Sequence, residues 1–149
     1  MNDIRDLYQQ VIFDHYRRPH NRRDIDHASH HAEGYNPLCG DRVKLELRIE
    51  NGIVTEVGFD GEGCAIATAS ASMMTDLIKG KTLAEAEQLI QRFQSMVTSD
   101  HEPAQSETQG LGKTTILAGV REFPARVKCA TLAWRTLSAA LHHKEHYEE

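Results

Sequence analysis

Three cysteines and one aspartate are the side chains of this 149-residue sequence best suited to specific chemistry: Cys39, Asp41, Cys64 and Cys129. Three thiolates and a carboxylate suit a tetrahedral zinc ion, and thiolates also hold iron–sulfur clusters. A thiolate is in addition the nucleophile of sulfur-transfer chemistry. Because these residues are far apart in the chain, any shared chemistry depends on the elements that position them.

The clearest strand pattern surrounds Asn51-Gly52. Apolar and charged residues alternate over 42–50, and a second alternation runs over 53–59, which predicts an antiparallel pair of half-buried strands. A two-residue turn would set the leucines of the first strand against Glu56 and Gly58, which makes a poor core face. We therefore expect a three-residue loop, residues 50–52, with its glycine in the left-handed position.

This register determines where the first three candidate residues lie. Leu45 is expected to face Val57, and the same ladder then brings Cys39 and Asp41 opposite the glycine-rich end of the second strand, beside Cys64. All three residues would reach the same edge of the sheet. The sequence thus predicts a joint thiolate and carboxylate site there.

Helical spacing of apolar residues predicts the other elements. The first helix carries Ile4, Leu7, Tyr8, Val11 and Ile12 on one face and stops at Pro19. A second helix follows Cys64 and ends at Gly80, and a Thr82/Glu85 capping box starts a third. Polar residues 98–113 are expected to form a long mobile connection, followed by a short apolar piece near 116–120 and a last helix with an inward stripe from Val127 to Leu141. The order predicts a single α+β domain over 1–149.

Cys129 is expected near the start of the last helix. The partial positive charge of a helix N-terminus, together with Arg126 and Lys128, would favour its thiolate. The alternative is that Cys129 is only a small buried apolar residue of a helical stripe. The residues alone leave both interpretations open.

Composition excludes several classes of protein. With 17 Lys and Arg against 22 Asp and Glu, the formal net charge is −5, which argues against nucleic-acid binding. No apolar run is long enough for a membrane span, and the N-terminus lacks the apolar stretch of a secretory signal. Three cysteines cannot all pair, so we expect a soluble cytoplasmic protein without a disulfide framework.

The basic run 17–23 is expected to be a solvated loop, although it could meet an acidic partner. The histidines could compete as metal ligands, but no helical pattern supports a site for them. We expect these to be solvated polar residues: His27, His30, His31, His142, His143 and His146.

Three stretches of sequence resemble the U-type iron–sulfur assembly family, and most closely its SufU branch. They are Asn-Pro-Leu-Cys-Gly-Asp at 36–41, Gly-Glu-Gly-Cys-Ala-Ile at 61–66 with Ala-Ser-Ala-Ser-Met-Met at 69–74, and Arg-Val-Lys-Cys-Ala-Thr-Leu-Ala-Trp-Arg at 126–135. The resemblance implies an IscU/NifU-like α+β fold in which about five helices pack on a three-stranded antiparallel sheet. Its additional strand would lie somewhere in residues 31–38.

The resemblance also implies a zinc site formed by Cys39, Asp41, Cys64 and Cys129. In the SufU branch such a site cooperates with a cysteine desulfurase, a pyridoxal-phosphate enzyme. The residue matching Cys39 is the catalytic one: it accepts persulfide sulfur and passes it on toward downstream cluster-assembly proteins. This implies a zinc-dependent sulfurtransferase.

Two features differ from the IscU branch. Lys128 stands where IscU proteins carry a histidine before the third cysteine, and residues 121–126 replace their chaperone-recognition segment. The connection 98–113 is likewise typical of SufU proteins. Sulfur transfer is therefore favoured over two alternatives, a scaffold that assembles a [2Fe–2S] cluster at the same four residues and a structural zinc domain that only binds partners.

Overall fold

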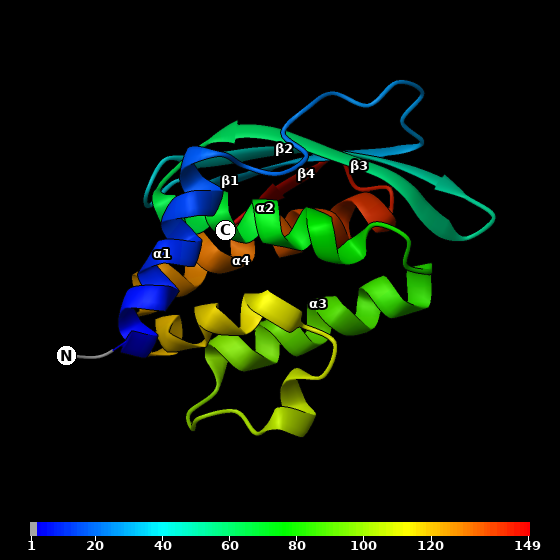
Figure 1. The fold of residues 1–149 in the computed structure, drawn as a ribbon. Helices are drawn as coiled ribbons and strands as arrows, with labels where there is room; N and C mark the ends of the chain where they lie inside the picture. The colour runs from blue at the N-terminus through cyan, green and yellow to red at the C-terminus, as the bar shows by residue number, and fades with distance from the viewer. Residues whose placement is uncertain (1–2) are drawn as a thin grey trace.

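The computed structural model describes residues 3–149, with side chains from residue 9 onward, as four α-helices, two 3-10 helices and one four-stranded sheet (Figure 1). The predicted apolar positions Ile4, Leu7 and Tyr8 therefore lie outside the described side chains. The helices are α1 (Asp3–Arg17), α2 (Ala65–Ile78), α3 (Leu83–Thr98), η1 (Gln105–Thr108), η2 (Gly112–Glu122) and α4 (Pro124–Leu141). The strands are β1 (His30–Asn36), β2 (Asp41–Glu50), β3 (Ile53–Glu62) and β4 (His146–Glu148).

The sheet has the order β3-β2-β1-β4, and its first three strands are antiparallel. β1 is the additional strand that the resemblance implied. The expectation of three strands is wrong by one, because the C-terminal segment adds β4 parallel to β1, with Gly34 opposite Tyr147. A strand of three residues is too short to show an alternation in the sequence, so the sequence does not predict this strand.

The hairpin between β2 and β3 corrects the predicted loop and register. Asn51 and Gly52 both have positive φ, 53° and 75°, as a two-residue type I′ turn requires. A β-bulge next to Ile49 then shifts the pairing, so that Leu45 faces Phe59 rather than Val57. Because β3 contains one extra residue at the bulge, the two-residue turn still leaves the apolar side chains of both strands on one face. Periodicity in the sequence does not reveal such a bulge.

Helices cover one face of the sheet in two layers. α2 and α4 lie directly beneath the strands, and α3 with η2 lies beyond them (Figure 1). In β2 the residues facing the helices are buried and the intervening ones are mostly exposed, as predicted. Trp134 of α4 is fully buried and stacks on Phe93 of α3, with ring centroids 4.4 Å apart.

The third helix begins as predicted, with both hydrogen bonds of the Thr82/Glu85 capping box formed. The connection after it is more structured than expected: it contains η1 and the start of η2, and Leu111 between them is fully buried. A single buried leucine anchors this polar segment to the core, which a search for periodicity does not detect. Over residues 3–149, no helix combines the length and apolar character needed to cross a membrane.

Candidate metal centre

Four separate elements supply the four candidate residues. Cys39 lies in the turn between β1 and β2, and Asp41 is the first residue of β2. Cys64 is the N-cap of α2, as predicted, and Cys129 lies in the second turn of α4. The turn, the strand end and the helix start meet at one end of the sheet, where α4 passes beneath it.

Three of the four residues converge closely. One ligand atom from each of Cys39, Asp41 and Cys129 lies within 4.8 Å of the others. The Sγ atoms of Cys39 and Cys129 are 3.6 Å apart, and the three cysteines are free thiols. The predicted register was wrong, yet the convergence holds, because a shift of two residues keeps the same side chains on the same face.

Cys64 is tied to the same site by its backbone. Its N–H donates to Oδ1 of Asp41 at 3.0 Å. Its Sγ accepts the N–H of Ala67 at 3.4 Å and thereby caps α2, so its sulfur stands outside the tight group of three. The Cys64 thiol is still near enough to Cys129 to raise the pKa of Cys129.

Burial separates the roles that the cysteines can play. Cys39 and Cys64 are exposed, whereas Cys129 is buried. Burial, followed by the neighbouring Cys64, raises the pKa of the Cys129 thiol far above its ordinary range. Of the two interpretations left open for Cys129, its burial agrees with a small buried residue, because desolvation outweighs the helix N-terminus and its basic neighbours and favours the thiol; a bound cation would favour the thiolate instead.

Asp41 provides the clearest test of whether a metal fits. Its side chain is 1% exposed, and Oδ2 has no hydrogen-bond partner while Oδ1 accepts from Cys64. A buried carboxylate oxygen without a partner is costly, and a coordinated cation would satisfy it. Three sulfurs and one oxygen are a donor set that suits zinc. The residues present therefore fit the ion that the resemblance implied.

Asn36 is a residue of this site that the sequence did not single out. Its side chain is fully buried, its Oδ1 accepts the N–H of Leu38 at 3.2 Å, and its backbone carbonyl accepts the N–H of Gly40 at 2.8 Å. Asn36 also pairs with Asp41 across β1 and β2, and its Nδ2 has no partner. An asparagine three residues before a cysteine in a turn is a usable signal, since asparagine side chains commonly fix such turns.

Two exposed apolar side chains lie before candidate residues in the sequence, one directly before Cys39 and one six residues before Cys129. Leu38, which precedes Cys39, is 64% exposed, and Phe123, just before α4, is 52% exposed. The guanidinium of Arg126 lies over the Phe123 ring, 4.9 Å from its centroid. Cys39 is itself exposed, so its thiol is accessible from solvent beside Leu38.

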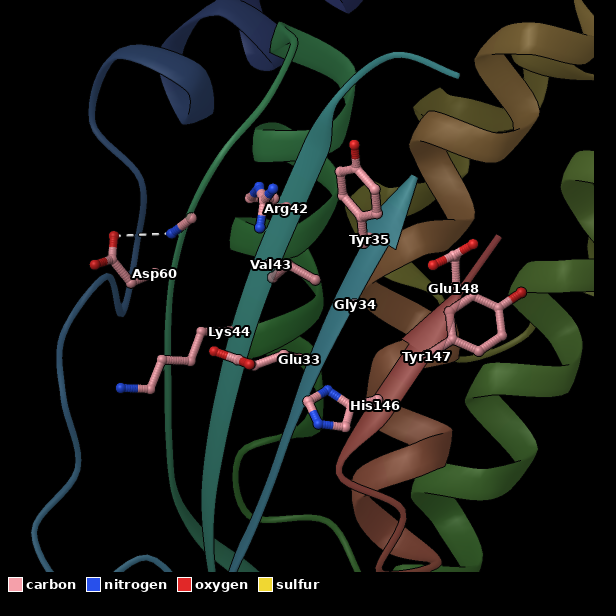
Figure 2. Close-up of a pocket in the computed structure, with 11 residues that line it drawn as sticks. Glu33, Gly34, Tyr35, Arg42, Val43, Lys44, Asp60, His146, Tyr147 and Glu148 are labelled. Carbon is pink, nitrogen blue, oxygen red and sulfur yellow. Dashed lines mark hydrogen bonds between the residues drawn. The ribbon is translucent and has the colours of Figure 1, made fainter. Parts of the chain in front are cut away.

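The outer face of the sheet carries a separate hollow of about 520 Å³ (Figure 2). Its polar lining includes Tyr35, Arg42, Lys44, His146 and Glu148, and none of the four candidate residues lines it. Of the six histidines expected to be solvated, His146 lines this hollow, and half-buried His30 stacks on exposed His143 with ring centroids 4.3 Å apart. Among the described side chains, none of these six histidines belongs to a potential metal-binding group.

Comparisons with known proteins identify the family. The NifU-like N terminal domain family matches residues 7–143. The zinc-dependent sulfurtransferase SufU of Bacillus subtilis is 41% identical over 93% of this chain and 92% of its own length. The iron–sulfur cluster assembly scaffold protein IscU of Streptococcus pyogenes is 40% identical over 95% of this chain and 86% of its own length.

Solved structures agree as well. A crystal structure of a hypothetical protein has a TM-score of 0.83 and 42% identity, covering 92% of this chain and 98% of that one. A crystal structure named as a candidate SUF-system scaffold, from Fervidobacterium islandicum, has a TM-score of 0.81 and 32% identity over 89% and 94%. The family match spans most of the chain and both relatives are aligned over nearly their whole length, so the resemblance inferred from the cysteine motifs is confirmed: the chain belongs to the NifU-like N-terminal domain family.

Proposed function

We propose that this protein accepts persulfide sulfur on Cys39 from a cysteine desulfurase and passes it on for iron–sulfur cluster assembly. The observation that carries the proposal is an exposed Cys39 thiol 3.6 Å from buried Cys129 and next to Asp41, whose Oδ2 has no partner. Only Cys39 and Cys64 of the three cysteines are accessible, and the Cys64 sulfur is held by the α2 cap. Cys39 is therefore the favoured acceptor.

Cys39, Asp41, Cys64 and Cys129 would hold the zinc ion. When bound, zinc supplies the positive charge that keeps the cysteines as thiolates and neutralises the buried carboxylate. The relative from Bacillus subtilis is named a zinc-dependent sulfurtransferase, which supports this assignment. Asn36 fixes the turn that carries Cys39 through its bonds to Leu38 and Gly40.

The transfer step is a thiol exchange. The Cys39 thiolate attacks the outer sulfur of the desulfurase persulfide, and a new sulfur–sulfur bond forms at Cys39. The bond between that outer sulfur and the desulfurase cysteine breaks, and its electron pair leaves with the desulfurase cysteine as a thiolate. The outer sulfur keeps its proton, so the exchange needs no oxidant or reductant. The outer sulfur that Cys39 has accepted then passes to downstream cluster-assembly proteins.

Replacing Cys39 tests the proposal directly. We expect Cys39→Ser to fold normally, as judged by circular dichroism, but to leave desulfurase turnover at the rate of the desulfurase alone. Radiolabelled sulfur from cysteine should appear on the wild-type chain as a reductant-sensitive label and be absent from the variant. Undiminished activation or labelling of Cys39→Ser contradicts the proposed role.

A scaffold for a [2Fe–2S] cluster is the second candidate, because the relative from Streptococcus pyogenes is named a scaffold and the same thiolates suit a cluster. Anaerobic reconstitution with iron and sulfide separates the two functions. A stable visible chromophore and its efficient transfer to an apo-acceptor favour the scaffold. A desulfurase rate that does not respond to the protein, together with unfolding when zinc is removed, indicates a structural zinc domain instead.

A further inference from the structure

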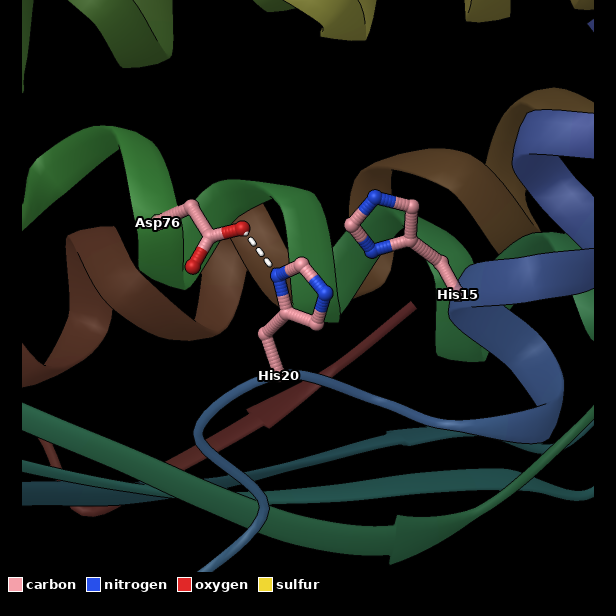
Figure 3. A group of neighbouring side chains, drawn as sticks. All are labelled: His15, His20 and Asp76. Atoms are coloured by element: carbon pink, nitrogen blue, oxygen red, sulfur yellow. Dashed lines mark hydrogen bonds and ion pairs between the residues drawn. The ribbon is translucent and has the colours of Figure 1, made fainter.

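A second group of potential ligands lies away from the thiols, where the end of α1 meets α2. It consists of His15 from α1, His20 from the loop after it, and Asp76 from α2 (Figure 3). One ligand atom from each residue lies within 4.8 Å of the others, and the two imidazole rings have centroids 4.5 Å apart. His20 belongs to the basic run 17–23 that is expected to be a solvated loop, and no local pattern in the sequence connects it with Asp76.

Neighbouring polar groups hold these side chains in place. Asp76 Oδ2 is paired with Nδ1 of His20, and Asp76 Oδ1 accepts from Asn21 Nδ2 at 3.1 Å. The buried Ser72 hydroxyl lies 2.7 Å from Nδ1 of His15 and accepts the backbone N–H of His20 at 2.7 Å. Such outer contacts orient the ligands of metal sites. Ser72 and Asp76 both belong to α2, so this helix holds His15 and His20 in place.

We propose that His15, His20 and Asp76 bind a divalent transition-metal ion, of the class of Zn²⁺, Co²⁺ or Ni²⁺, at a site separate from the thiols. Two imidazoles and one carboxylate suit these ions, whereas Mg²⁺ and Ca²⁺ prefer oxygen ligands throughout. Three protein ligands also leave a coordination position open. A cavity of about 230 Å³ adjoins all three residues and provides room for water or a small ligand there.

The protonation state and the exposure of the group suit a metal site, whereas its cationic neighbours Arg17, Arg18 and Lys113 oppose a bound cation. Burial is the main cause that lowers the pKa of His15, so its imidazole is held in the neutral form that binds metals. His20 and Asp76 are about half exposed, which gives an ion access from solvent. Lys113 lines the same cavity, and a fourth ligand that is an anion would therefore meet a cationic neighbour.

Metal binding to the zinc-loaded full chain tests this proposal without any desulfurase. We expect equilibrium dialysis against Co²⁺, with metal analysis, to give one saturable equivalent of cobalt in addition to the retained zinc. Its visible spectrum should show d–d bands without thiolate-to-cobalt charge transfer, because no sulfur is among the ligands. Ring-nitrogen resonances of His15 and His20 should shift with that equivalent.

Matched variants identify the ligands. His20→Asn and Asp76→Asn should each weaken the additional binding by at least about tenfold, while zinc content remains unchanged. His27→Asn is the control, since His27 is a loop histidine with φ of 57°, a conformation that asparagine tolerates. Absence of the second equivalent, charge-transfer bands that reveal exchange at the thiols, or undiminished binding by His20→Asn would each overturn the proposal. The group would then serve only to fasten α1 to α2.

Discussion

Individual atoms of Asp41 and Asn36 carry much of the case for a metal centre. Asp41 Oδ2 is a buried acceptor and Asn36 Nδ2 a buried donor, and neither has a hydrogen-bond partner although the residues pair across two strands. Leaving a buried polar group unpaired costs on the order of 1–3 kcal/mol. Both unpaired atoms lie in the part of the fold that carries the three free cysteines. A coordinated cation explains the acceptor, and Asn36 faces the turn that presents Cys39.

At this scale we predict the effect of removing the Asn36 side chain. Asn36→Ala loses the bond from Oδ1 to the N–H of Leu38, so the free energy of unfolding of the zinc-loaded protein should fall by about 1 kcal/mol. Denaturant titration measures this change. Asn36→Ser, which keeps an acceptor oxygen for the turn, should recover part of the loss. Equal stability of the alanine variant and the wild type would argue against this role.

Among the elements, the approach of β3 to α2 controls the space around Asp41. Gly63 lies between them, and a Cβ at this position would come 2.9 Å from Asp41 Oδ1 and 3.3 Å from the Cβ of Ala67. Asp41 is buried and already bonded to the N–H of Cys64, so it has little freedom to move aside. The absence of a side chain at Gly63 therefore keeps the carboxylate beside the sulfurs.

Gly63→Ala should displace Asp41 and accelerate zinc release to a chromophoric chelator by about tenfold, as expected when an interaction that orients a ligand is disturbed. Thr82→Ala is a suitable control. It breaks the capping box of α3, far from Asp41 in the fold, and should lower stability by about 1 kcal/mol. Its zinc release should be unchanged. If both variants release zinc at the same rate, stability and not the position of Asp41 controls release.

For the whole molecule, the candidate centre connects three segments that lie far apart in the chain, around residues 39–41, 64 and 129. A zinc ion held by Cys39, Asp41, Cys64 and Cys129 would link a turn, a strand and two helices. Removing zinc should therefore lower the melting temperature by roughly 10 °C, on the basis of about 4 kcal/mol when free zinc exceeds its dissociation constant about a thousandfold.

Differential scanning calorimetry with and without a chelator measures this change. Cys129→Ala serves as the comparison, since a variant without that ligand should respond little to the chelator. A wild-type melting temperature that is the same with and without zinc would mean that the four residues do not hold an ion in the folded state.

The pH dependence of stability is a second property of the whole molecule, and it involves His30 of β1 and His143 of the C-terminal segment, whose rings stack. Burial and then the charge of His143 lower the pKa of His30 below its ordinary value of 6.5. The folded state therefore disfavours protonated His30. The free energy of unfolding therefore decreases as the pH falls below 6.5, because the unfolded chain then binds the proton more readily than the folded one.

An NMR titration of the His30 ring should therefore give a midpoint below 6.5, and His143→Asn should raise it. The same variant should make unfolding less sensitive to pH between 7 and 5. An unchanged midpoint in His143→Asn would show that the stacked pair does not interact through charge.

Much of the arrangement follows from local patterns in the sequence. The alternation in β2 and β3 determines which side chains face the helices, and the capping residues Cys64 and Thr82 start α2 and α3. These features depend on neighbours within a few residues, so periodicity and residue type suffice to predict them. The cysteine motifs likewise identify the family from the sequence.

Other features were decided only when distant segments packed together. The two-residue turn and the bulge next to Ile49 together place Leu45 opposite Phe59 in the core. β4 pairs with the edge of β1 that β2 does not occupy. Burial by the surrounding fold raises the pKa of Cys129, an effect that the local charges in the sequence do not indicate. The meeting of His15, His20 and Asp76 likewise requires α1 to lie on α2. The sequence by itself therefore determined the residues and local elements of this protein, while register, burial and long-range contacts depend on free energies of packing that only the tertiary structure reveals.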